Sequence, residues 1–299
     1  MKILTLTKRN IKLFFKDKGM FFTSLITPVI LLVLYATFLA GIYRDTFVAS
    51  FPPGMAVSDA IIDGCVAGQL ISSLLAVSCV TVAFCSNFVM VHDKASGTLK
   101  DFTVAPVRPH ELALGYYLAA LLSSMAVCFA ALAVCLAYVA CVGWYMSFAD
   151  VLLLALDVFL LVMFGTALSS VINFFLSSQG QISAVGAVIS AGYGFICGAY
   201  IPISQFSAGL RGVISFLPGT YGTALVRGHS MNGLFNEMLA EGVPRQVVDG
   251  IMDAIDCNIY FFGDKVPVSV QYIVLAAAVA ALIALYVLLN AVKNRKEAR

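Results

Sequence analysis

Few residues in this chain have the type and spacing that catalysis needs. His110-Glu111 begins the pattern of a zinc-peptidase helix, but Leu114 occupies the place of the second histidine. The chain has no Gly-Lys dipeptide, so it cannot form a glycine-rich phosphate-binding loop, and it has no Gly-x-Ser-x-Gly nucleophile turn. His92 and His229 are far from each other and from any acid–base partner that spacing supplies. The sequence therefore predicts no enzyme, no resident cofactor and no metal site.

Asp157 is the one ionisable residue inside a predicted membrane span. A charge at the bilayer centre costs roughly 2.5–3.5 kcal/mol on insertion scales, and less near an interface. An intramembrane acid is therefore a candidate site for a cation or a proton. The other interpretation is an acid near the outer surface, reached by water or paired locally. We favour the second, because Asp157 lies close to one end of its span.

A short charged segment, residues 94–112, interrupts two long apolar runs. Gly97 predicts a turn, and the Thr98 hydroxyl could cap a short helix. Leu99 and Phe102 then share one face of that helix, and Pro106 stiffens the chain beyond it. Such a face indicates either a knob that enters a partner's groove or a turn that lies on lipid headgroups, and periodicity does not separate the two.

The elements around these residues are predicted membrane helices. Of the 299 residues, 61% are hydrophobic and 11% are charged, whereas soluble domains carry about a quarter charged residues. The apolar runs are continuous, which favours helices over barrel strands. We predict an all-α integral membrane protein in which six runs are long enough to span: 21–42, 66–91, 112–138, 151–173, 182–201 and 270–292.

The distribution of charge predicts the orientation. Lysine and arginine cluster before the first span, between the second and third, and after the sixth, so both termini and residues 92–111 are expected in the cytoplasm. The net charge of +2 does not favour nucleic acid as a partner. Residues 1–19 show an apolar stripe, Ile3, Leu4, Ile11, Phe14 and Phe15, opposite their cations. This pattern favours an interfacial amphipathic helix and an uncleaved first span.

Residues 202–269 are the longest segment between spans. Their first part is apolar but broken by Pro202 and Pro218, which predicts a re-entrant hairpin buried in protein. Tyr221 is expected to place its ring in the interface with its hydroxyl toward water. Arg227 should mark the return to the external surface, solvated or paired with acids. The second part predicts a small external cap, so the chain is one membrane domain, 1–299.

Small residues and cysteines leave alternatives open. Gly186, Ser190, Gly194 and Gly198 recur every four residues, which indicates either a subunit seam and pathway wall or ordinary packing. The eight cysteines contain no Cys-x-x-Cys pair. Cys65, Cys141 and Cys257 are expected at or beyond the outer face. The two alternatives there are a Cys65–Cys257 disulfide and free thiols.

Two stretches resemble one family. The pattern around Gly97-Thr98-Leu99, followed by Pro106-Val107, is similar to the first cytoplasmic loop of type-2 ABC transporter permeases, which export drugs, peptides, lipids or polysaccharides. Gly198, Pro202, Leu217-Pro218, Tyr221 and Arg227 resemble that family's signature before the last span. Ser207 stands where many members carry another proline, which is a departure from the family's pattern.

The resemblance implies a function and partners. A separate ABC ATPase subunit would bind ATP and Mg, and a second permease copy or homologue would complete a dimer whose pathway lies along spans two and five. The chain would move an amphipathic substrate outward across the cell membrane, that is, a bacterial inner membrane. The coupling residues would be Gly97, Thr98, Leu99, Phe102, Pro106 and Glu111. The alternatives are an ion-gradient-driven transporter and a non-transporting sensor or immunity subunit.

Overall fold

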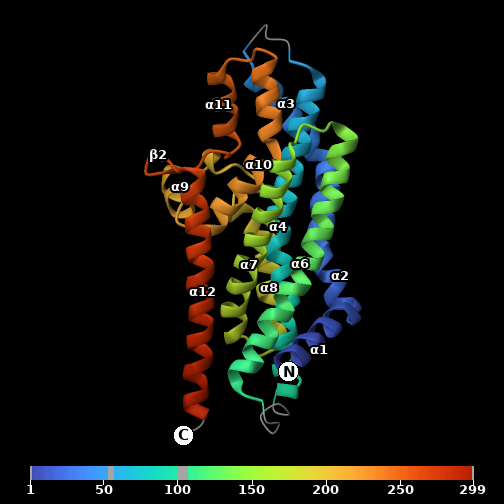
Figure 1. Cartoon of the computed structure of the whole chain (residues 1–299), viewed down its shortest axis with the longest axis vertical. Coiled ribbons are helices and arrows are strands. Elements are labelled where there is room, and N and C mark those ends of the chain that lie inside the picture. The colour runs from blue at the N-terminus through green and yellow to red at the C-terminus, as the bar shows by residue number, and fades with distance from the viewer. Residues whose placement is uncertain (1, 53–56, 100–106, 298–299) are drawn as a thin grey trace.

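The computed structural model describes residues 2–52, 57–99 and 107–297 as a bundle of helices (Figure 1). The strands in this part of the chain are β1 (Tyr260–Phe261) and β2 (Asp264–Lys265), which pair antiparallel. Both termini lie at one end of the bundle, here named the terminal end, and helix α11 (Arg245–Ala254) lies at the opposite end, the cap end.

Five helical stretches of the described chain are long and apolar enough to cross a membrane. The first runs from Lys18 to Ser50 through α2 (Lys18–Leu34), the π-helical turn η1 (Tyr35–Leu39) and α3 (Ala40–Ser50). The others belong to α4 (Asp59–Ala95), α6 (Pro109–Val142), α7 (Phe148–Phe175) and α12 (Val268–Glu297). The fold is therefore helical and membrane-spanning, as predicted.

The fifth predicted span, 182–201, corresponds to α8 (Gln179–Ile196), which is not among these five. Its 18 residues include two glutamines in the first turn, Gln179 and Gln181, and several glycines. A helix this short and polar at one end only just reaches the length that a bilayer requires, about 20 residues. Six spans therefore remain a prediction, with five of them supported by helix length and composition.

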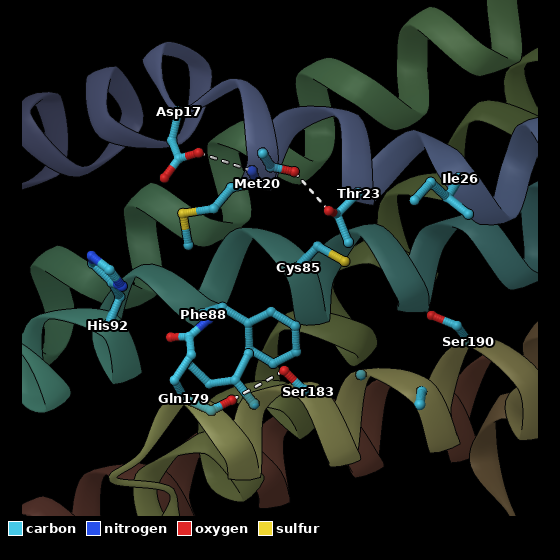
Figure 2. A pocket seen from close by; sticks show the side chains of 14 residues that line it. Asp17, Met20, Thr23, Ile26, Cys85, Phe88, His92, Gln179, Ser183 and Ser190 are labelled. Atoms are coloured by element: carbon cyan, nitrogen blue, oxygen red, sulfur yellow. Dashed lines mark hydrogen bonds between the residues drawn. The ribbon is translucent and has the colours of Figure 1, made fainter.

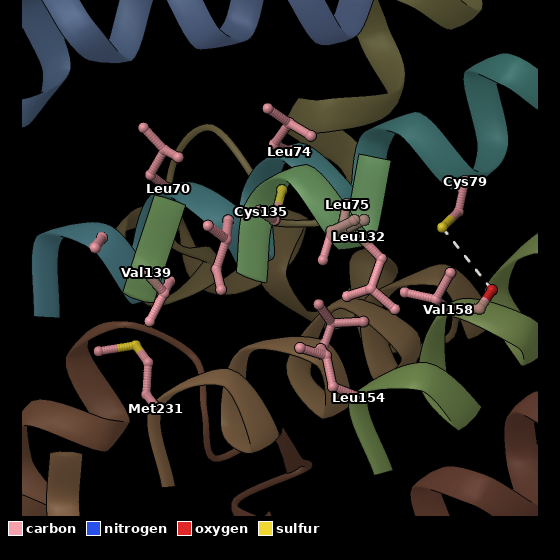
Figure 3. Packing of buried hydrophobic residues seen from close by; sticks show 14 of the residues in the cluster. Leu70, Leu74, Leu75, Cys79, Leu132, Cys135, Val139, Leu154, Val158 and Met231 are labelled. Atoms are coloured by element: carbon pink, nitrogen blue, oxygen red, sulfur yellow. Dashed lines mark hydrogen bonds between the residues drawn. The ribbon is translucent and has the colours of Figure 1, made fainter. Parts of the chain in front are cut away.

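Helix α4 is the centre of the bundle. It packs against α6, α7, α10 (Pro218–Ala240), α2 and α8. Its 37 residues are buried along almost the whole helix, which explains why the sequence is apolar on every side. In Figure 3, Leu75 of α4 lies beside Leu132 of α6 in the core, with Leu154 of α7 close by. At Gly165 of α7, an added Cβ would lie 2.9 Å from the Cys79 carbonyl oxygen, so glycine permits the close α4–α7 approach.

Helix α1 (Lys2–Lys16) packs against α6 at the terminal end. Its buried face contains Leu6, Asn10 and Phe14, while Leu4 and Phe15 of the predicted apolar stripe are exposed. The helix stops at Asp17, whose carboxylate accepts a hydrogen bond from the Met20 amide (3.1 Å) and caps α2. The amphipathic segment is thus helical, and one of its faces rests on protein.

The segment between α8 and α12 folds as short pieces followed by a long helix. The 3₁₀ turn η2 (Ile203–Gln205) follows Pro202, and α9 (Ala208–Ile214) precedes Pro218, which occupies the first turn of α10. Proline is suited to that place because the first helical amides have no intrahelical acceptor. Helix α10 starts against α7 and α8, where an added Cβ at Gly222 would meet Leu161. It then extends toward the cap end beside α11 (Figure 1).

Candidate functional site

The expected coupling residues lie at the terminal end, between α4 and α6. Gly97 has φ +82°, a left-handed turn that favours glycine, and the hydroxyls of Ser96 and Thr98 are 2.9 Å apart. Thr98 and Leu99 are helical, and Leu99 is partly buried against the main core cluster. Phe102 and Pro106 lie outside the described residues. The face that was expected to await a partner is therefore in part already in contact with this chain.

Glu111 has a local structural role in the same region. Its carboxylate accepts a hydrogen bond from the Arg108 amide (2.8 Å), which closes the first turn of α6. Pro109 at the first helical position and an acid two residues later are a typical helix start. The sequence contained this signal, because arginine-proline followed by glutamate precedes a long apolar run.

An ion pair that spacing did not reveal joins three helices at this end. Arg9 of α1 donates two hydrogen bonds to Asp93, at 2.5 and 3.1 Å, and the Tyr116 hydroxyl of α6 donates to the same carboxylate at 2.6 Å. The hydrogen bond to Asp93 raises the pKa of the Arg9 guanidinium, although burial opposes it, so Arg9 stays charged. We name these three residues the α1–α4–α6 clamp.

Lys94 extends the clamp to a fourth helix. Its ammonium donates to the carbonyl oxygens of Asn173, Phe174 and Leu176, at 3.0, 2.8 and 3.2 Å, at the end of α7. A cation is favourable there because the last carbonyls of a helix lack intrahelical donors. The last turn of α4 therefore holds α1, α6 and α7 together immediately before the Gly97 turn.

Arg227 occupies the other end of the molecule and is fully buried, with 0% of its surface exposed. It donates to the carbonyl oxygens of Ile255 (2.5 Å) and Gly198 (2.8 Å), and it lies 3.8 Å from the Asp256 carboxylate. Of the two expected alternatives, solvation is excluded by burial, and pairing with an acid of the cap is what the structure shows. The physical reason is that α10 starts inside the bundle, so a residue midway along it is enclosed by the cap.

Asp256 connects Arg227 to the start of the hairpin. Its carboxylate accepts hydrogen bonds from the amides of Ile203 and Ser204, the latter at 3.2 Å. Burial raises the pKa of Asp256, against the opposing effects of Arg227 and the two amides. Gly198 has φ +74°, and an added Cβ there would lie 2.8 Å from Ile203 Cγ1. We name Gly198, Arg227 and Asp256 the cap lock.

The other hairpin residues also turn inward. Pro202 is buried beside η2, and Pro218 begins α10. Tyr221 is 4% exposed, and its hydroxyl donates to the Ser215 carbonyl oxygen at 2.7 Å. The expected water-facing hydroxyl is therefore wrong, because the loop before α10 folds back over the ring and supplies an acceptor.

Asp157 lies in a polar joint between three helices. Its carboxylate is 2.6 Å from His229 Nδ1 of α10 and accepts from the Tyr272 hydroxyl of α12 at 2.5 Å. The residue is completely buried, so local pairing rather than access by water satisfies it. His229 therefore does have an acid partner, which was invisible in the sequence because 72 residues separate the two.

The small residues of α8 lie in two different surroundings. Gly186 and Ser190 line a cavity of about 510 Å³ between α2, α4 and α8, together with Phe88, His92 and Gln179 (Figure 2). At Gly186 an added Cβ would make ordinary contact with the Phe88 ring, at 3.5 Å. At Gly194 it would collide with the ring of Tyr200, in the chain directly after α8. The regular stripe thus serves a cavity at one end and local packing at the other.

The described part of the chain contains no candidate metal site and no disulfide. No group of three or more His, Cys, Asp or Glu side chains there could hold a metal ion. All eight cysteines are free thiols, including Cys65 and Cys257. Burial raises the pKa of the Cys257 thiol to about 12, so this thiol is protonated and weakly reactive at neutral pH.

Comparison with protein families identifies the class. The sequence model of the ABC-2 type transporter family matches residues 1–229, and the chain belongs to this family. It is the membrane permease domain of an ABC transporter, a multi-pass protein that has no ATPase site of its own. A search of the curated proteins finds no match to this chain.

Proposed function

We propose that this chain is the permease subunit of an ABC exporter, which moves an amphipathic substrate outward with energy from a separate ATPase subunit. The observation that carries the proposal is the four-helix attachment just before the Gly97 turn, formed by the clamp and Lys94. A segment that receives force from a partner must be rigidly joined to the helices that move. Here α1, α6 and α7 are all joined by side-chain contacts to the last turn of α4.

The terminal end is then the cytoplasmic end, in what we take to be a bacterial inner membrane. The basic residues of the N-terminus, of the segment before α6 and of the C-terminus support this orientation. The ATPase subunit would bind ATP and Mg and would contact Leu99 and the adjoining residues, including Phe102. The permease itself would contribute no step of hydrolysis.

The substrate path is proposed along the cavity that α2, α4 and α8 line. Its wall mixes apolar side chains with His92, Gln179, Ser183 and Ser190, which suits an amphipathic molecule. The cavity opens on one side of the chain, so a second permease copy or homologue would complete its wall. The hairpin 202–228 is proposed as a re-entrant external gate, held by the cap lock. The joint at Asp157 would keep α7, α10 and α12 aligned, rather than carry an ion.

The coupling assignment is tested by replacing both Leu99 and Phe102 with aspartate. The double variant should insert normally but lose substrate-stimulated ATPase activity and transport in the reconstituted complex. Lys100→Ala is the control and should behave like the wild type, because helical spacing places Lys100 off the face that Leu99 and Phe102 share. Normal transport by the double variant would contradict the coupling role. If the wild-type chain binds the ATPase subunit but transports nothing, the sensor alternative is favoured. If it transports substrate without the ATPase subunit, an ion-gradient mechanism is favoured.

A further inference from the structure

A second groove lies on the other side of α2 and differs from the proposed path in its chemistry. It has a volume of about 580 Å³, within the range of about 300–1,000 Å³ that ligand sites occupy. Leu25 and Leu32 of α2, Leu70 and Leu74 of α4, and Ala130 and Val134 of α6 form its wall. Nearly all of this wall is hydrocarbon, along three helices of membrane length.

The groove is open because α2 and α6 pack on α4 but have almost no contact with each other. Two features of the sequence favour this separation. Pro28, which lines the groove, cannot donate a backbone hydrogen bond within α2, and the helix continues into the π turn Tyr35–Leu39. On the α6 side, Ala126, Ala130 and Ala131 leave room where larger side chains would fill the gap.

The terminal end of the groove has aromatic side chains, and lysines lie next to them in the sequence. Phe15 and Phe21 lie there with their ring centroids 5.7 Å apart, at the junction of α1 and α2. Lys12, Lys16 and Lys18 flank these rings, and all three are exposed. None of the three has a carboxylate partner among the residues that the structure describes. Lys12 precedes Phe15 by three residues, so the two share one face of α1.

We propose that this groove binds one anionic glycerophospholipid, with an acyl chain between α2 and α6 and the phosphate on Lys12, Lys16 and Lys18. The apolar groove matches the acyl chain of such a lipid, and the lysines without carboxylate partners match its negatively charged phosphate. The lipid fills the gap beside α2 and holds α1 at the membrane surface. The inference depends neither on the direction of transport nor on the partner ATPase.

The test is lipid retention by the full-length chain extracted from bilayers of equal phosphatidylglycerol and phosphatidylcholine, measured by native mass spectrometry. The wild-type chain should retain phosphatidylglycerol in preference. Replacing Lys12, Lys16 and Lys18 with glutamine should lower that preference by about fivefold for each cation removed. Lys265→Gln, at the cap end, is the matched control and should retain the preference.

A second pair of variants tests the acyl-chain position. Ala130→Trp places a large side chain in the groove at an exposed position, so the variant can fold while both lipids lose their site. Leu156→Trp, on the exposed face of α7, is the control and should retain lipid like the wild type. Ala126→Leu gives a smaller obstruction should the tryptophan variant be poorly inserted.

Four results would overturn the inference. Equal retention of the two lipids by the wild type would mean ordinary annular lipid only. Unchanged retention in both groove-filling variants would place the lipid elsewhere. Loss of a dimer, rather than of lipid, in Ala130→Trp would identify the groove as a contact between copies of this chain. Competition by inorganic phosphate alone would likewise contradict a lipid with an inserted chain.

Discussion

The clamp and the cap lock each contain one arginine and one aspartate, but they are built differently. In the clamp, Arg9 meets Asp93 side chain to side chain, and the Arg9 side chain is 31% exposed. In the cap lock, Arg227 is enclosed and bonds mainly to backbone carbonyls, with Asp256 at 3.8 Å. Water can replace a partner of Arg9 but cannot reach Arg227.

The difference indicates separate roles for the two pairs. A partly exposed ion pair can open and close at modest cost, because solvent stabilises the separated charges. A buried charge that loses its partner has no such compensation. The clamp suits an end of the molecule that changes its contacts, whereas the cap lock suits a fixed anchor at the two ends of the hairpin.

The largest expected effect is at the cap lock. Arg227→Met leaves Asp256 and two carbonyl groups buried without their cation, which should destabilise the folded chain by about 3–5 kcal/mol. Thermal unfolding in detergent measures the loss. Arg245→Met on α11 removes an exposed arginine and should have little effect. If the two variants were equally stable, the cap lock would not be a structural element.

Substituting one glycine at each end of the molecule compares the cap end with the terminal end. Gly198→Ala and Gly97→Ala both place a side chain at positive φ, but only at Gly198 is the added Cβ crowded, 2.8 Å from Ile203 Cγ1. We expect Gly198→Ala to cost about 1–3 kcal/mol more than Gly97→Ala, because overpacking adds to the backbone strain. Unfolding of the two single variants measures the difference. Equal costs would show that the hairpin readily yields around Gly198.

The clamp should give a smaller effect on stability and a larger one on activity. Asp93→Asn removes the carboxylate charge to which Arg9 of α1 and Tyr116 of α6 donate. The folded chain should lose about 1.5–3 kcal/mol of stability, which is typical of hydrogen bonds to an ionised group. Substrate-stimulated ATPase activity of the assembled transporter should fall with it. Asp59→Asn is the control, because Asp59 pairs with Arg44 on the surface, where such pairs contribute about 0–1 kcal/mol. Full activity in Asp93→Asn would contradict a coupling role for the clamp.

The smallest effect concerns pH at the cap lock. Burial raises the pKa of Asp256 in the folded chain, so the stabilisation from its protonated form is complete below the unfolded pKa of about 3.9. This stabilisation is lost as the pH rises through the folded pKa, by about 1.4 kcal/mol for each unit between the two pKa values. The unfolding temperature of the wild type should therefore fall relative to Asp256→Asn as the pH rises above 4 or so. A rise instead would mean that pairing with Arg227 outweighs burial.

Much of the fold followed from local sequence signals. Continuous apolar runs predicted the helices, and Pro109 and Pro218 lie where α6 and α10 begin. The family followed from short motifs around Gly97 and before α12. The site roles drawn from those motifs, such as coupling by Leu99 and gating by the hairpin, stay predictions.

Only the tertiary structure decided which polar residues meet. Arg9 and Asp93 are 84 residues apart, and His229 and Asp157 are 72 apart, so no periodicity relates them. The enclosure of Arg227 depends on where α10 enters the bundle and on how the cap folds over it. By itself the sequence determined which segments are apolar and helical, because helix formation and membrane insertion depend on neighbouring residues. It did not determine these partnerships, because they depend on how separate helices pack around α4.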